Sequence, residues 1–192
     1  MRAVNGCKRN IDYAASMGCG IIIGFLKGGP GSDREVSERL FLESMLELKP
    51  YIEEKKVQVL IEATNHKEAS IIRTLKEGAH VINFLDCPFI QLLADTYHMN
   101  IEEPSLVDSL SEYMNYYPHL HISDDNRAYP GLGSLDFTAI YRKLMECGYK
   151  GTVAVEGNIQ HGLLEDTQIC AAYLHKVCSG LHTPSRVPSH AV

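Results

Sequence analysis

The strongest constraint on the fold is an alternation between short β-rich apolar runs and longer stretches whose apolar residues recur at helical intervals. The five β-rich runs are GCGIIIGFLKGG (18–29), VQVLIEATN (57–65), FIQLLADTYHMN (89–100), HLHISDD (119–125) and GTVAVEG (151–157). This alternation is typical of βαβ units, in which a helix connects two parallel strands. The sequence therefore predicts an α/β protein built on a parallel sheet.

The helical pattern predicts six helices around these strands. They are expected over residues 6–18, 32–56, 67–78, 104–117, 136–149 and 163–178. No internal linker or repeat separates them, so residues 1–178 are interpreted as one domain. The polar, proline-containing segment 179–192 is predicted to be a disordered tail.

Composition limits the classes of partner. The chain has 192 residues and a net charge of −6, which argues against a nucleic-acid partner because such partners favour a basic face. Its longest apolar runs fall short of the ~20 residues that a membrane helix needs. The six cysteines occur without a CxxC pair and are expected to be reduced and packed in the interior of a cytoplasmic protein.

Charged and polar side chains lie at the carboxyl ends of the last four predicted strands. They are Glu62, then Asp95 with His98, then His121, then Glu156. Ligands collect at the carboxyl ends of parallel strands, both in α/β barrels and in open sheets. Three carboxylates and one imidazole suit Mn²⁺, Mg²⁺ or Co²⁺ better than a metal that prefers thiolates. A metal site is predicted at these strand ends.

Two glycine-containing segments are interpreted as loops. GFLKGGPGS (24–32) lacks the spacing of a phosphate-binding or dinucleotide-binding motif and is predicted to connect a strand to a helix. PGLG (130–133) suits a tight turn.

Three segments together resemble a known family: LLADTYHMNIEE (92–103), HLHISDDNRAYPGLGSLDF (119–137) and ECGYKGTVAVEG (146–157). They are similar to the sugar isomerases and epimerases with a xylose isomerase-like TIM barrel, and within that group to the D-tagatose 3-epimerase and D-psicose 3-epimerase branch. The resemblance extends from about residue 8 to residue 178 and implies a (β/α)8 barrel of which this chain carries about the last five βα units. The chain is accordingly expected to be N-terminally truncated relative to the family.

The resemblance also implies roles for seven residues. Glu62, Asp95, His121 and Glu156 would bind one divalent metal ion, with Mn²⁺ expected first and Mg²⁺ or Co²⁺ as alternatives. Glu62 and Glu156 would also be the catalytic acid/base pair. The remaining three residues would bind the sugar substrate; they are Glu68, His98 and Arg127.

The expected activity is a ketose 3-epimerase that removes and returns a proton at carbon 3 through a metal-stabilised enediolate. His66 and Lys67 depart from the arginine and aromatic residue that relatives more often carry. Alternatives within the family are epimerases or isomerases of sugar phosphates or 3-keto-glycosides. Endonucleases acting at abasic DNA share the fold, but they use more histidine ligands, for zinc. A catalytically incomplete barrel fragment is the non-enzymatic alternative.

The expected partners are a small-molecule sugar and further copies of the chain in a dimer or tetramer. No nucleic acid or membrane partner is expected. An incomplete barrel would leave the apolar run IIIGFL (21–26) as an exposed edge that favours self-association.

Overall fold

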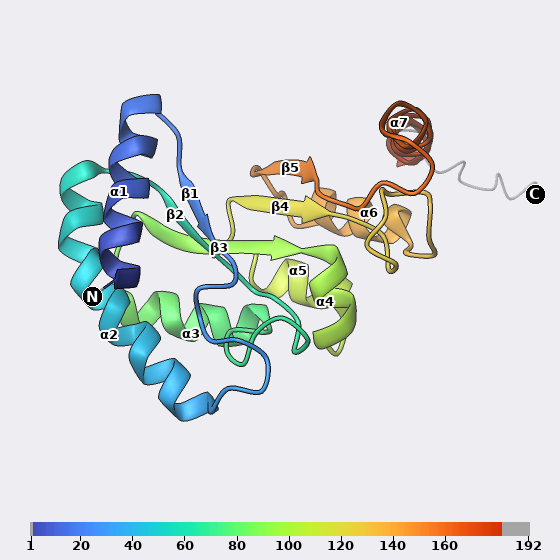
Figure 1. Ribbon diagram of the computed structural model, residues 1–192. Coiled ribbons are helices and arrows are strands. Elements are labelled where there is room, and N and C mark those ends of the chain that lie inside the picture. Colours follow the sequence, from blue (N-terminus) through green and yellow to red (C-terminus); the bar gives the residue numbers. More distant parts are fainter. Residues whose placement is uncertain (1, 182–192) are drawn as a thin grey trace, which may run out of the picture.

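A curled sheet of five parallel strands forms the centre of the computed structural model, which describes residues 2–181 (Figure 1). The strands are β1 (Ile21–Ile23), β2 (Val59–Glu62), β3 (Ile90–Asp95), β4 (His119–Ile122) and β5 (Thr152–Val155). Their spatial order is the same as their order in the chain, and every neighbouring pair is parallel. This arrangement is a partial TIM barrel and confirms the predicted fold class.

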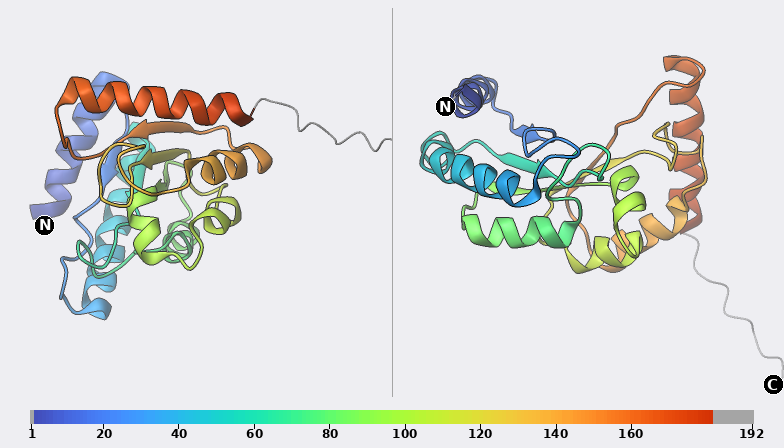
Figure 2. Two further views of the ribbon diagram at one scale, coloured as in Figure 1. Left: turned by 90° about the vertical axis from the view of Figure 1, so that its right-hand side faces the viewer. Right: turned by 60° about the horizontal axis from the view of Figure 1, so that its bottom comes forward.

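Seven helices accompany the strands in the described residues, arranged around the outside of the curl (Figures 1 and 2). They are α1 (Arg2–Met17), α2 (Arg34–Lys55), α3 (Leu75–Leu85), α4 (Thr96–Glu102), α5 (Leu106–Glu112), α6 (Phe137–Glu146) and α7 (Leu163–Leu181). Buried side chains of the helices and the strands form one hydrophobic core. Ile11 of α1, Ile52 of α2 and Leu75 of α3 are fully buried at 0% exposure, together with Val59 and Ile61 of β2. This core fixes the directions of the strands and therefore the positions of their carboxyl ends.

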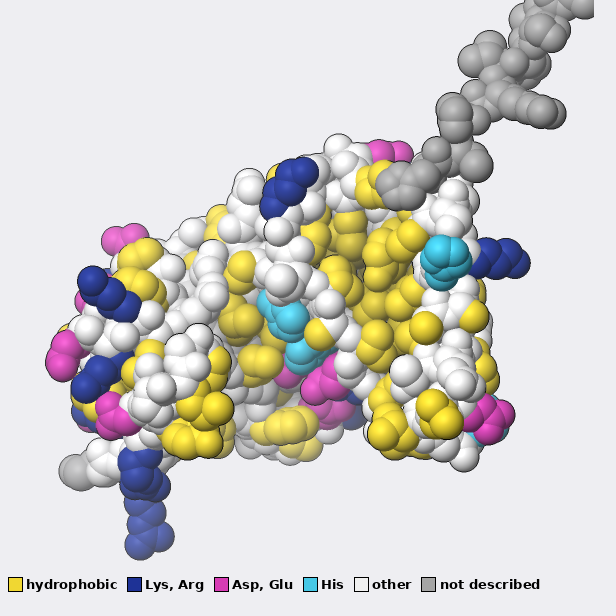
Figure 3. Space-filling model, turned by 90° about the horizontal axis from the view of Figure 1, so that it is seen from above, with side chains coloured by type: hydrophobic (Ala, Val, Ile, Leu, Met, Phe, Trp, Pro, Cys, Tyr) yellow, Lys and Arg dark blue, Asp and Glu magenta, His cyan; other side chains and the backbone are white. Residues whose placement is uncertain are grey.

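The sheet has two open edges in the described part of the chain, because β1 pairs only with β2 and β5 pairs only with β4. Apolar side chains are exposed at both edges: Ile22 on β1, Phe25 and Leu26 after it, and Val153 and Val155 on β5. Viewed from above, the molecule is hollowed, and histidine and acidic side chains gather beside apolar ones in the hollow (Figure 3). The predicted exposed edge at IIIGFL is thus present.

The strands are shorter than predicted, and the difference matters most at β3. The sequence was interpreted as a strand through Asn100, but β3 ends at Asp95 and α4 begins at Thr96. The Asp95 carboxylate caps that helix: its Oδ1 accepts hydrogen bonds from the backbone N–H groups of Tyr97 at 2.8 Å and His98 at 3.4 Å. An aspartate that accepts these N–H groups favours the start of a helix over continuation of a strand.

The predicted helix over 67–78 is wrong in its position. The segment up to Arg73 is a loop, and α3 begins at Leu75 after the N-cap residue Thr74. Thr74 Oγ1 accepts a hydrogen bond from Glu77 N, and Glu77 Oε2 accepts one from Arg73 N. The threonine cap, and a glutamate in the first turn that accepts from the residue before the cap, mark a helix start.

Two further expectations change in detail. All six cysteines are free, but only Cys7, Cys87 and Cys170 are buried, whereas Cys19 is exposed. Helix α7 continues to Leu181, three residues beyond the predicted domain boundary at 178, and the rest of the predicted tail lies outside the described residues. Among residues 2–181, no helix has the length and apolar character needed to cross a membrane.

Candidate metal centre

Four side chains from four consecutive strands converge at the carboxyl edge of the sheet. Glu62 ends β2, Asp95 ends β3, His121 lies in β4, and Glu156 directly follows β5. One potential ligand atom from each residue lies within 4.8 Å of the corresponding atoms of the other three. The predicted cluster is therefore assembled by the sheet itself.

The imidazole of His121 faces all three carboxylates. Its Nδ1 lies 2.9 Å from Glu156 Oε2, 3.9 Å from Glu62 Oε1 and 3.9 Å from Asp95 Oδ2. Three of the four residues are buried, and the Glu156 side chain is 48% exposed. The cluster therefore has a closed side formed by the sheet and an open side at Glu156.

Burial disfavours the ionised forms of two of these carboxylates, those of Glu62 and Asp95. Burial, followed by the charges of Asp95 and Glu156, raises the pKa of Glu62 to about 8. Burial also raises the pKa of Asp95, although the Arg127 guanidinium opposes that shift. Glu62 Oε1 is buried without a hydrogen-bond partner among the described residues.

A divalent cation fits this set of residues. Three carboxylates and one imidazole form an oxygen-rich set of ligands of the kind that manganese and magnesium prefer, with one nitrogen. A cation would satisfy the unpartnered oxygen of Glu62 and offset the repulsion that raises its pKa. The residues that would hold it are Glu62, Asp95, His121 and Glu156.

Arg127 joins the two sides of the cluster. Its Nη1 donates to Asp95 Oδ2 at 2.7 Å, and its Nη2 donates to Glu156 Oε2 at 2.8 Å. Arg127 has a left-handed backbone with φ of 63°, which is uncommon outside glycine. Its carbonyl accepts a hydrogen bond from Asn158 N at 2.6 Å, which links the loop after β4 to the loop after β5.

His98 and Glu68 lie on the side of Glu62. His98 Nε2 is 3.8 Å from both Glu62 Oε1 and Glu68 Oε2. The His98 ring is buried, and burial, together with the positive charges of Arg127, Lys27 and His121, lowers its pKa to about 3. The structure thus brings all seven predicted residues together around one point.

Sequence reasoning missed a buried cation next to this point. Lys27 lies in the glycine-rich loop after β1 and is only 1% exposed. Its ammonium donates to Gly24 O and to Thr64 Oγ1, and burial lowers its pKa to about 8 while Glu62 and Glu68 act in the opposite direction. The sequence signal for a buried lysine was its place between an apolar run and a glycine pair. Its hydrogen-bond partner Thr64 is 37 residues away in the chain.

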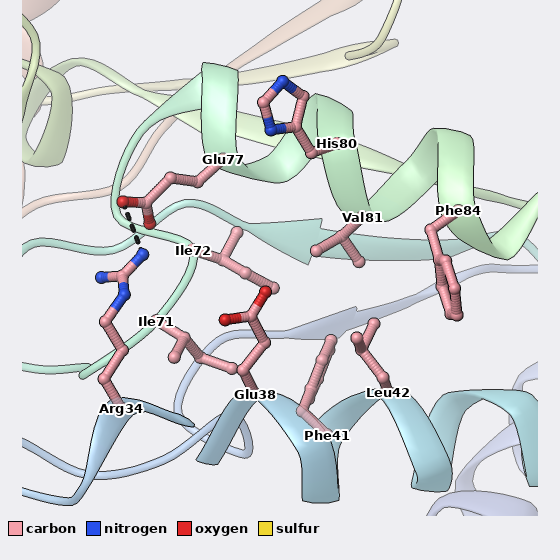
Figure 4. Close-up of a pocket in the computed structure, with 10 residues that line it drawn as sticks. All are labelled: Arg34, Glu38, Phe41, Leu42, Ile71, Ile72, Glu77, His80, Val81 and Phe84. Carbon is pink, nitrogen blue, oxygen red and sulfur yellow. Dashed lines mark ion pairs between the residues drawn. The ribbon is translucent and has the colours of Figure 1, made fainter. Parts of the chain in front are cut away.

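A second hollow lies between helices α2 and α3 (Figure 4). It measures about 310 Å³ and has an apolar floor that includes Phe41, Ile72 and Val81. Glu38 and His80 also line it, and Arg34 and Glu77 form an ion pair at 2.8 Å across its rim. The cluster of potential metal ligands lies at the strand ends instead.

Comparison with known proteins agrees with the partial TIM barrel. The family model described as "Xylose isomerase-like TIM barrel" matches residues 1–172. The chain is 37% identical to 3-dehydro-D-guloside 4-epimerase of Escherichia coli over 102 residues. This matched region covers 53% of this chain and 39% of that protein. The chain is 32% identical to D-psicose 3-epimerase of Ruminiclostridium cellulolyticum over 121 residues. This second matched region covers 63% of this chain and 41% of that protein.

A solved structure shows the same architecture. The crystal structure of 3-keto-D-glucoside 4-epimerase from E. coli superposes with a TM-score of 0.80 at 26% identity, covering 92% of this chain and 70% of that one. The chain spans less than half the length of the two curated relatives described above.

Proposed function

This chain belongs to the xylose isomerase-like TIM barrel family, and we propose that it supplies the active site of a metal-dependent sugar epimerase. The proposed reaction is epimerisation of a ketose at carbon 3. The observation that carries the proposal is the meeting of Glu62, Asp95, His121 and Glu156 within 4.8 Å at the strand ends.

Glu62 and Glu156 are the proposed proton carriers. They approach the cluster from β2 and from the loop after β5, with β3 and β4 between them. One carboxylate removes the proton from the carbon next to the carbonyl, and the other, in its acid form, returns a proton to the opposite face. The substrate is inverted at that carbon, and no external oxidant or reductant is needed.

The proposed cofactor is one divalent ion, with Mn²⁺ first and Mg²⁺ or Co²⁺ as alternatives. When bound, such an ion supplies positive charge that stabilises the electron-rich intermediate between the two proton transfers. The donor set supports the proposal, because oxygen ligands with a single imidazole suit these ions.

We propose that His98, Glu68 and Arg127 form hydrogen bonds with the substrate oxygens. These residues flank the cluster on two sides, with His98 and Glu68 beside Glu62 and Arg127 between Asp95 and Glu156. A guanidinium and an imidazole N–H donate hydrogen bonds to oxygens that gain negative charge, while the Glu68 carboxylate accepts one from a hydroxyl.

A 3-keto-glycoside is the second candidate substrate. It is favoured by the 37% identity to 3-dehydro-D-guloside 4-epimerase and by the solved 3-keto-D-glucoside 4-epimerase. The chemistry is the same proton exchange next to a carbonyl, at carbon 4 in place of carbon 3. The two candidates therefore differ in the sugar and share the roles of Glu62 and Glu156.

Deuterium exchange tests the proposal directly. The chain is incubated with Mn²⁺ in D₂O with fructose, tagatose, psicose or sorbose, and in parallel with a 3-keto-glucoside. Incorporation at carbon 3 of a ketose, abolished by Glu156→Gln, is the expected result. Incorporation at carbon 4 of the keto-glycoside alone would move the assignment to the second candidate. Absence of exchange in folded, metal-loaded protein would overturn both.

We also propose that the chain works as a homo-oligomer, a dimer or a tetramer, in the cytoplasm. Exposed apolar side chains at the two open sheet edges support self-association, and six free thiols support a reducing compartment. Size-exclusion chromatography with light scattering tests the assembly. A monodisperse dimer or tetramer is expected, whereas a monomer or aggregated material would contradict it.

A further inference from the structure

His98 receives two hydrogen-bond donors on one ring nitrogen. Asn65 Nδ2 lies 2.8 Å from His98 Nδ1, and the backbone N of Asn65 lies 3.3 Å from the same atom. A backbone N–H can only donate, so His98 Nδ1 must be the acceptor. Asn65 is 0% exposed and His98 1% exposed, which protects both contacts from water.

The orientation of the Asn65 amide is fixed independently. Its Oδ1 accepts a hydrogen bond from Lys67 N at 2.9 Å, and this contact turns Nδ2 toward the imidazole. The carboxamide therefore joins the turn at residues 65–67 to the His98 ring on α4. Both sides of the Asn65 amide are used, and neither can be reversed without losing a hydrogen bond.

An acceptor at Nδ1 determines the other nitrogen of the ring. In a neutral imidazole one nitrogen carries the proton and the other accepts, so the proton of His98 resides on Nε2. Nε2 lies 3.8 Å from Glu62 Oε1 and from Glu68 Oε2, beyond hydrogen-bonding distance of either. This N–H lies beside Glu62 and Glu68, where we locate the substrate oxygens.

We propose that Asn65 is a positioning residue that fixes His98 as the Nε2–H tautomer, so that His98 acts as a hydrogen-bond donor to a substrate oxygen. This inference rests on the proposed function for the identity of the ligand, although the tautomer itself does not. It makes His98 a donor to a carbonyl or hydroxyl and excludes it as the base that removes the carbon-bound proton.

Asparagine is suited to this task in a way that an aspartate is not. The Asn65 amide offers an acceptor to Lys67 N and a donor to His98 Nδ1 at the same time. Replacing it by Asp keeps the size and the acceptor for Lys67 but places a carboxylate oxygen against Nδ1. Two acceptors in contact repel each other, so the proton moves to Nδ1.

Nitrogen NMR of histidine-labelled protein tests the inference. The ¹⁵N shifts of His98, assigned with a His98→Asn variant, are recorded for the wild-type chain, Asn65→Asp and Asn83→Asp. Asn83 is exposed on α3, so its replacement adds the same charge away from the site. We expect an unprotonated Nδ1 and a protonated Nε2 in the wild type and in Asn83→Asp, and a protonated Nδ1 in Asn65→Asp.

The functional consequence is measured on the same three proteins. We expect Asn65→Asp to lower kcat/KM by about 10- to 100-fold, by analogy with the loss of partners that orient metal-binding histidines. Mn²⁺ affinity stays within a few fold, because Asn65 is not one of the four proposed ligands. We expect Asn83→Asp to retain the kcat/KM and the Mn²⁺ affinity of the wild type.

The two readouts separate the two proposals. A protonated Nδ1 in the wild type, or an unchanged Nδ1 in Asn65→Asp, overturns the role of Asn65 whatever the activity. The wild-type spectrum alone can overturn it even if the variant does not fold. Loss of all deuterium exchange in wild-type protein with the expected His98 tautomer overturns the proposed function instead.

Discussion

Asp95 and His121 are register partners on adjacent parallel strands, and Asp95 Oδ2 lies 3.9 Å from His121 Nδ1. Partners in a parallel ladder direct their side chains to the same face of the sheet. Two of the four proposed ligands are therefore positioned by backbone hydrogen bonds between β3 and β4. Glu62 and Glu156, at the ends of the flanking strands, complete the cluster.

Asp95→Asn should lower Mn²⁺ affinity by at least about 10-fold and leave the fold intact. The amide removes a negative ligand but can still accept the N–H groups of Tyr97 and His98 that start α4. Isothermal titration calorimetry measures the affinity, and thermal unfolding checks the fold. Asp136→Asn is the matched control, because Asp136 caps α6 through Ala139 N without being a proposed ligand. Equal affinity in the wild type and Asp95→Asn would contradict the assignment of Asp95.

The metal-free chain should lose stability as the pH rises. Glu62 has a folded-state pKa of about 8, above its ordinary value of 4.5, so the folded state retains a proton that the unfolded state releases. The stabilising contribution is present below about pH 4.5 and is lost as the pH rises through about 8. Its size is at most a few kcal/mol.

Urea unfolding between pH 5 and 9 measures this dependence. We expect Glu62→Gln to flatten the slope and to be more stable than the wild type at pH 9 in the absence of metal. Saturating Mn²⁺ should reduce the loss in the wild type, since a bound cation favours the ionised carboxylate. A slope that is identical in wild type and Glu62→Gln would show that Glu62 does not titrate in this range.

The cluster was predictable because it depends on a regular feature. Carboxyl ends of parallel strands meet at one edge of a sheet, so residues at the carboxyl ends of four β-rich runs converge when the strands are ordered as in the chain. The helix after Thr74 was misplaced because the pattern of apolar residues at 69–72 resembles a helical face. In the structure, Ile71 and Ile72 lie in a loop and their side chains are buried, and Ile72 has a left-handed φ of 54°.

The support around the cluster was not predictable, because its contacts are long-range. Lys27 is 37 residues from Thr64, and Asn65 is 33 residues from His98. Sequence periodicity reports which face of an element is buried, but not which loop meets which helix. Only the packed arrangement of β1, β2 and α4 brings these pairs into contact.

Arg127→Lys should lower kcat/KM by about 10- to 100-fold while the chain remains folded. The guanidinium bonds Asp95 and Glu156 through two nitrogens, and an ammonium cannot reproduce that planar geometry. Loss of one charge-assisted hydrogen bond of about 1.5–3 kcal/mol accounts for the size of the effect. Steady-state kinetics with the ketose identified by deuterium exchange measure it. Arg142→Lys, an exposed position on α6, is the control and should match the wild type.

Gly133→Ala should destabilise the loop that carries Arg127. A Cβ at Gly133 would lie 2.3 Å from Asp125 Oδ1 and 2.5 Å from Asp124 Oδ1. Asp124 is 0% exposed, and its carboxylate accepts hydrogen bonds from the backbone N–H groups of Gly131, Gly133 and Leu135. The added methyl group therefore pushes against a buried carboxylate whose partners hold the loop closed.

The expected loss for Gly133→Ala is about 1–3 kcal/mol in the free energy of unfolding, with reduced activity because Arg127 shifts. Gly162→Ala is the matched control, since a Cβ at Gly162 would have no neighbour within 4 Å. Denaturant unfolding of both variants gives the difference. If the two substitutions cost the same, the close approach at Gly133 does not hold the loop in place.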